Sequence, residues 1–218
     1  MDVNGEIMFS PEYGLRDLIR VKDHTVWIQQ AFNRVRHYYL NPADQILRPD
    51  NGFGSLILCF SAIEYLAKLE VSIDALMQNP DDIGSARRFI GWINRHLPDY
   101  EKYGEAIYQG FRCGLVHGGQ VTGAGENRRT RGTPQIRRDM TLTGTIDHNL
   151  KAIAAPHEKY KDVLVMNPSK LIDFLLAHLP KIERAILRSP DETKSYYNKL
   201  QFLHCQDIKI FQKQARSA

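Results

Sequence analysis

The chain has 218 residues, of which 43% are hydrophobic and 25% are charged, and its formal net charge is +4. This length allows a hydrophobic core without disulfides or metals, and the composition excludes a disordered or fibrous chain. Three cysteines without Cys-x-x-Cys or Cys/His spacing exclude a disulfide scaffold and a structural zinc site. We predict one helical domain over residues 1–218.

The sequence predicts a cytoplasmic protein without a membrane span. The first residues carry acidic side chains and no apolar core, unlike a secretory signal. The longest apolar stretch, 53–69, contains Ser61, Glu64 and Lys68, so we expect it to fall short of a span. No phosphate-binding loop, His-Glu-x-x-His or Gly-x-Ser-x-Gly motif is present, and we expect neither a cofactor nor a metal.

Apolar residues at steps of three and four predict helices in the first half of the chain. A helix over 15–40 is expected to stop at Asn41 and Pro42. A mostly buried helix should begin near Ser55 and close before Asn79 and Pro80. A third helix is expected over 82–96, capped by Asp82.

A fourth helix, over 103–117, places Ile107, Phe111 and Leu115 on one face. Gly110 and Gly114 each weaken this helix by about 1 kcal/mol relative to alanine, which favours close packing against another backbone.

Residues 120–167 form an Arg-rich loop insertion with two predicted strands, in DMTLTGTI and DVLVM, which we expect to pair as a small β-hairpin. A long helix should follow from 168 or 169 to 188, with a wide apolar face and a site for a kink at Pro180. Residues 190–218 are a C-terminal extension, either a last helix or a loosely held segment. The predicted fold is mainly α, with about five helices and the insertion before the last long helix.

The segment YQGFRCGLVHGG places Arg112 and His117 in an Arg-x4-His arrangement at the end of the fourth helix. Together with LCFSAIEYLAKL, in which Glu64 stands where an acidic residue is common, it resembles the HEPN domains, small helical bundles that often carry Arg-x4-6-His. The resemblance covers about residues 15–120 and 168–188. It departs at Cys113, because nuclease members often have Asn, Asp or His after the arginine.

The resemblance implies a homodimer in which two such motifs form one composite cleft. On an α-helix Arg112 and His117 would be about 7.5 Å and about 140° apart, so one copy alone makes a poor site. A histidine at a helix C-terminus is a suitable acid or base, and an arginine can stabilise a phosphate. The implied reaction is metal-independent cleavage of single-stranded RNA that leaves a 2′,3′-cyclic phosphate. The predicted RNA-binding residues are Arg128, Arg129, Arg131, Arg137 and Arg138.

Two classes of function remain open. One is a HEPN-type ribonuclease of the toxin or defence kind, with an antitoxin or a nucleotidyltransferase-like partner, which the basic insertion favours. The other is a non-catalytic module for dimerisation or for binding a nucleotide or protein, which Cys113 favours. In that case Arg112 would be a surface arginine that pairs with Glu105 or Glu64, and His117 would cap its own helix. The other seven histidines show no ligand spacing and are interpreted as solvated or packing residues: His24, His37, His96, His148, His157, His178 and His204.

Overall fold

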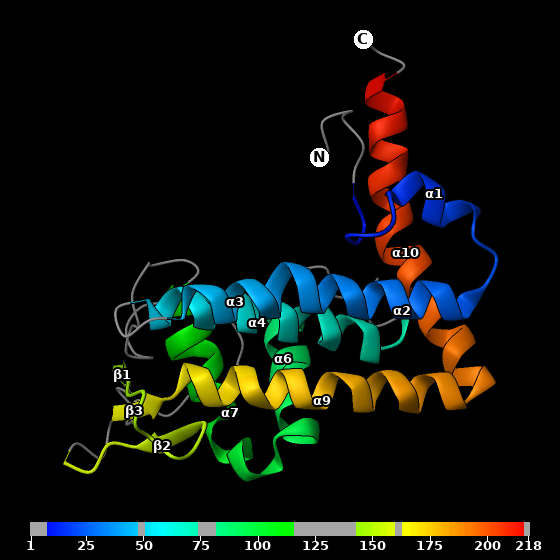
Figure 1. Cartoon of the computed structure of the whole chain (residues 1–218). Coiled ribbons are helices and arrows are strands. Elements are labelled where there is room, and N and C mark those ends of the chain that lie inside the picture. Colours follow the sequence, from blue (N-terminus) through cyan, green and yellow to red (C-terminus); the bar gives the residue numbers. More distant parts are fainter. Residues whose placement is uncertain (1–7, 48–50, 74–81, 116–142, 160–162, 216–218) are drawn as a thin grey trace.

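The structure is a computed structural model, and it describes residues 8–47, 51–73, 82–115, 143–159 and 163–215. Within these residues the chain is mainly helical with one small sheet, which confirms the predicted fold class at that level. Two long helical rods lie side by side, one made of α2 and α3 and the other of α9 (Figure 1). The sheet lies at one end of these rods, and α10 extends from the other.

The predicted first helix is divided into shorter elements. α1 (Leu15–Arg20) ends before α2 (His24–Val35), whose N-terminus is capped by the Asp23 side chain. A π-helical segment, η1 (Arg36–Leu40), then leads directly into α3 (Asn41–Ile46). The predicted stop at Asn41 and Pro42 is therefore wrong. Pro42 lies within the first two residues of α3, where proline is tolerated better than in a helix interior.

The central helix is α4 (Gly52–Glu70), which begins close to the predicted start but ends earlier than predicted. Its buried side chains include Leu56, Phe60 and Ile63, and Ser55 donates a hydrogen bond to the Ala43 carbonyl at 2.8 Å. Contrary to the sequence-based expectation, α4 is long and apolar enough to cross a membrane by length and composition. However, 56% of its apolar window is buried within the described bundle, which is compatible with a soluble protein.

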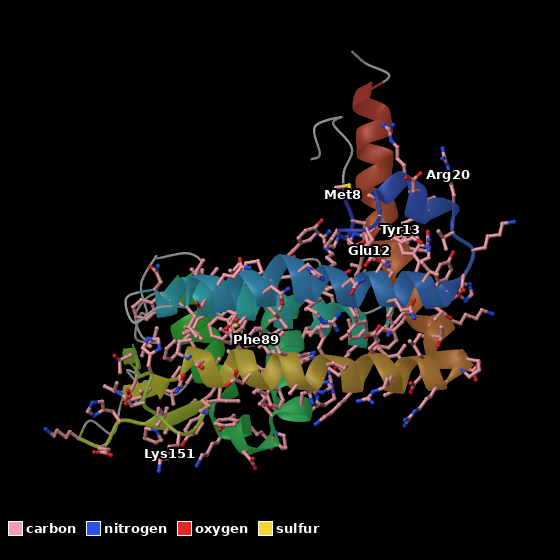
Figure 2. The ribbon with its side chains drawn as sticks, viewed as in Figure 1. Met8, Glu12, Tyr13, Arg20, Phe89 and Lys151 are labelled. Carbon is pink, nitrogen blue, oxygen red and sulfur yellow. The ribbon has the colours of Figure 1, made fainter. Side chains whose placement is uncertain are left out.

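α6 (Asp82–His96) has the predicted bounds and crosses beneath α4 (Figure 1). Its Phe89 ring meets the Phe60 ring of α4 edge to face, with the ring centroids 5.8 Å apart. Phe89 lies inside the helical bundle (Figure 2). The chain continues through a 3₁₀ turn, η2 (Pro98–Tyr103), then α7 (Gly104–Ala106) and a π-helical segment, η3 (Ile107–Cys113). The predicted apolar face of Ile107, Phe111 and Leu115 is buried, as expected.

The predicted hairpin is wrong, although both of its strands are present. β1 (Thr143–Ile146) pairs with β3 (Val163–Met166) in parallel, and β2 (Ala154–Pro156) pairs with β3 antiparallel, so the strand order is β1-β3-β2. Parallel strands cannot be joined by a tight turn, and the connecting segment contains β2. Lys151, before β2, lies at the lower edge of this region in the view of Figure 2.

α9 (Pro168–Arg188) has the predicted bounds, and the 190–215 part of the predicted extension is a helix, α10 (Pro190–Ala215). The buried Asn167 caps α9 by accepting a hydrogen bond from the Lys170 amide. Its side-chain amide also donates to the His148 and Leu150 carbonyls, at 3.0 and 2.7 Å. One asparagine thus joins the sheet region to the helical body.

The segment before α1 packs beside α2 and α10, where Glu12 and Tyr13 are seen above α2 (Figure 2). Ser10 donates to the Gln30 side chain at 2.7 Å, and Gln30 donates to Glu12 at 2.9 Å. On α10, the His204 ring meets the Phe9 ring edge to face at 4.8 Å, and its Nε2 lies 3.2 Å from the Tyr65 hydroxyl.

This environment makes His204 acid-sensitive. Burial, and to a smaller extent Arg34 and Lys68, lowers the pKa of His204 from 6.5 to about 4. The folded state therefore binds fewer protons than the unfolded state between pH 6.5 and 4, so its stability falls as the pH falls through that window. In His204→Gln, the decrease in the free energy of unfolding between pH 6.5 and 4 should be smaller by up to about 3 kcal/mol. Urea unfolding at several pH values measures this difference. Exposed His37→Gln is the control; an unchanged pH dependence in His204→Gln would contradict the prediction.

Candidate functional site

Arg112 lies in η3, near the end of the described part of the fourth helical region. In a π-helix the backbone hydrogen bonds join residues i and i+5. The α-helical geometry expected from the sequence is therefore absent from Ile107 to Cys113. π-helical turns are rare and occur frequently at functional sites. The Arg112 side chain is therefore attached to a π-helical backbone and not to an α-helical one.

The guanidinium of Arg112 forms an ion pair with the carboxylate of Glu64 on α4, with Nη2 and Oε1 2.6 Å apart. Only 12% of the Arg112 side chain and 23% of the Glu64 side chain are exposed. Of the two acidic partners considered from the sequence, the structure thus pairs Arg112 with Glu64. A pair this sheltered from water is held more firmly than an exposed one, since solvent screens it less.

Three more side chains surround this pair. Ser85 of α6 donates a hydrogen bond to Glu64 at 3.2 Å. The Arg112 guanidinium carbon lies 5.4 Å from the centroid of the buried Tyr108 ring, within range of a cation–π interaction. Arg112 Nη1 also contacts the Cys113 sulfur at 3.8 Å. The polar cluster therefore joins α4, α6 and η3.

The charge on Arg112 is secured by its neighbours. Burial is the largest single influence and lowers the pKa of its guanidinium, but Glu64, Tyr108 and Cys113 together outweigh it, and the net effect is a raised pKa. For Tyr108, burial is the largest influence and raises the pKa of its hydroxyl. Arg112 is therefore a fixed cation that is paired with Glu64, and it cannot exchange a proton near neutral pH.

The structure brings together three of the predicted site residues, Arg112, Glu64 and Cys113. The remaining ones lie outside the described residues: His117, Arg128, Arg129, Arg131, Arg137 and Arg138. Among the residues that are described, no group of three or more His, Cys, Asp or Glu side chains is arranged to hold a metal ion. Cys59 is buried in α4, and burial raises the pKa of its thiol to about 12, so it is unsuited to act as a thiolate.

The structure brings together two of the histidines that were interpreted as solvated or packing residues. The facing ring nitrogens of His96 and His178 lie 2.9 Å apart, and His96 also contacts Glu70 at 2.6 Å. They are 82 positions apart in the chain, so no local spacing signals their contact. The two helices that carry them, α6 and α9, both pack against α4, and this arrangement brings the rings together.

Comparison with family models, with curated proteins and with solved structures finds no match to this chain. The likeness to HEPN domains therefore rests on the Arg-x4-His segment and the helical pattern.

Proposed function

We propose that the chain is a metal-independent endoribonuclease of the HEPN type, in which Arg112 and His117 act at the axis of a homodimer. The observation that supports this most is the state of Arg112. It is a sheltered cation, oriented by Glu64 and Tyr108, on a π-helical segment that ends four residues before His117. A preorganised cation of this kind stabilises the negative charge that develops on a phosphate during cleavage.

In the proposed reaction, His117 removes the proton from the 2′-hydroxyl of the RNA, and the 2′-oxygen attacks the adjacent phosphorus. The bond from phosphorus to the 5′-oxygen breaks, and the products are a 2′,3′-cyclic phosphate and a 5′-hydroxyl, which takes up a proton. Arg112 holds the phosphate throughout. The Arg128–Arg138 segment supplies positive charge for binding, and the enzyme acts in the cytoplasm, paired with an antitoxin-like or nucleotidyltransferase-like protein.

The test is an RNA cleavage assay with the full chain and a single-stranded RNA labelled at its 5′ end. We expect cleavage in excess EDTA, with fragments whose 3′ ends resist phosphatase until mild acid opens the cyclic phosphate. This follows because a histidine and an arginine can perform the reaction without a metal. Cleavage that occurs only with added Mg²⁺ would contradict the proposal.

A second candidate is a non-catalytic helical module, and the same ion pair favours it. Arg112 is engaged by Glu64, Tyr108 and Cys113, as is typical of an arginine that joins helices. A substrate phosphate would have to compete with the Glu64 carboxylate. RNA binding that weakens with salt but never leads to cleavage, and that is unchanged in His117→Ala, would support this candidate.

A further inference from the structure

A second group of ionisable side chains, separate from the Arg112 cluster, joins three helices. Glu70 is the last residue of α4, His96 is the last residue of α6, and His178 lies within α9. The Glu70 carboxylate oxygen lies 2.6 Å from His96 Nε2, and His96 Nδ1 lies 2.9 Å from His178 Nε2. The three groups form a continuous hydrogen-bonded chain. Both distances fall within the range of strong hydrogen bonds.

Packing holds both rings in place. The His96 ring lies against the Trp92 indole, with centroids 4.6 Å apart, and the His178 ring stacks on Phe174 at 4.9 Å. Glu70 is only 12% exposed and also accepts two hydrogen bonds from Arg95, at 2.6 and 3.0 Å. The contact between the two imidazoles is therefore held from both sides, by Trp92 of α6 and by Phe174 of α9.

The chemistry of the three side chains limits how many protons the hydrogen-bonded series Glu70–His96–His178 can hold. An ionised carboxylate only accepts, so His96 Nε2 must donate to Glu70. In the neutral chain, His178 Nε2 then donates to the lone pair on His96 Nδ1. One added proton converts His96 into an imidazolium that donates to both Glu70 and His178. With a second added proton, both facing nitrogens carry hydrogen, and two cations meet at the distance of a hydrogen bond.

We propose that Glu70, His96 and His178 form a proton-binding switch, in which the first proton preserves the hydrogen bond between His96 of α6 and His178 of α9 and the second breaks it. The proposal is independent of the ribonuclease activity. It concerns a histidine pair, a common device for sensing mild acid. The two protons belong to the pair and not to either ring, because the groups interact strongly.

The surroundings keep Glu70 ionised and oppose a proton on His178. Burial is the largest influence on Glu70 and raises its pKa, but the hydrogen bonds and charges of His96 and Arg95 together outweigh it, and the net effect is a lowered pKa. For His178, burial, followed by the charges of His96 and Lys181, lowers the pKa, and Glu70 opposes this only in part. The charged and titratable groups that face the chain come from four helices: Glu70 of α4, Arg95 and His96 of α6, His178 and Lys181 of α9, and Tyr196 and Lys199 of α10.

The switch is tested by NMR of the histidine rings in the full chain between pH 8 and 4.5. We expect the His96 and His178 signals to move together in two steps, because they share the first proton. The second step should have its midpoint below the pKa of an ordinary histidine, because burial and the charges of His96 and Lys181 lower the pKa of His178. Nuclear Overhauser contacts between the two rings should disappear in that second step, while those between His96 and Trp92 persist.

Variants test whether both titration steps arise from Glu70, His96 and His178. Glu70→Gln keeps the shape of the side chain but removes its charge, so the midpoint of the first step should fall by about one pH unit. His178→Gln should leave a single step for His96. Exposed Glu101→Gln and His37→Gln are the controls and should leave both steps in place.

Independent single-step titrations of His96 and His178 in the wild-type protein would overturn the proposal, whatever the variants do. Ring contacts that persist through the second step would also overturn it, because the rings would then tolerate both protons. The wild-type titration decides the matter even if Glu70→Gln fails to fold.

Discussion

RNA cleavage by His117→Ala is expected to fall by about 10²- to 10⁴-fold, the usual contribution of a positioned acid or base. Arg112→Lys should lose activity to a similar degree, because lysine keeps the charge but lacks the planar fork that grips a phosphate. The measurement is the single-turnover rate with saturating RNA, together with the binding constant. Binding should change little if the Arg128–Arg138 segment supplies most of the attraction.

Mixing the two inactive variants tests the proposed dimer. If a cleft combines Arg112 of one protomer with His117 of its partner, a heterodimer of Arg112→Lys and His117→Ala contains one intact combination. Random pairing makes half of the dimers mixed, so up to about a quarter of the wild-type rate should return. Exposed His37→Ala is the control and should keep full activity. Full activity in His117→Ala would show that the site has been placed wrongly.

Glu64→Leu is expected to lower the free energy of unfolding by about 3 kcal/mol, because it leaves the sheltered Arg112 guanidinium without its carboxylate. The double variant Glu64→Leu with Arg112→Met should recover much of this loss, since an apolar pair can replace a buried ion pair at little cost. Urea unfolding of the wild type, both single variants and the double variant gives the coupling energy between the two residues.

The pair formed by Glu70 and Arg95 provides a control for this measurement. Arg95 is 54% exposed, so Arg95→Met should cost less than about 1 kcal/mol. A coupling energy below about 1 kcal/mol between Glu64 and Arg112 would contradict the prediction, because it would mean that solvent screens their ion pair as it screens an exposed one. RNA cleavage by folded Glu64→Leu separates the two candidate functions, because an enzyme whose Arg112 is misoriented should slow, whereas a non-catalytic module has no rate to lose.

Helices with a clear apolar period were predicted closely from the sequence. The bounds of α6 and α9 agree with the structure, because their apolar residues recur locally at the helical period. Pro42 was misinterpreted because the π-helical segment before it lets a new helical turn begin at Asn41. Such a turn leaves no distinctive pattern in the sequence.

The candidate site was predictable only in part. Arg112 and Glu64 were identified from their segments. The alternative that they pair with each other is confirmed, but the expected surface position of Arg112 is wrong, because its side chain is only 12% exposed. The part played by Ser85 and Tyr108 was not foreseen, since neither residue forms a motif with Arg112. The strands of the sheet were recognised from their alternating residues, but their parallel pairing depends on β2, which is only three residues long.

The sequence by itself determined the mainly helical class, the apolar faces that build the core, and Arg112 as the arginine of interest. These features depend on residues within one or two helical turns of each other, and a local period or motif records them. Only the tertiary structure decided which distant side chains meet. Glu64 meets Ser85 and Arg112, and His96 meets His178, through the way α4, α6, η3 and α9 pack. Contacts between residues tens of positions apart follow from how whole helices cross, and a single sequence carries no local record of that geometry.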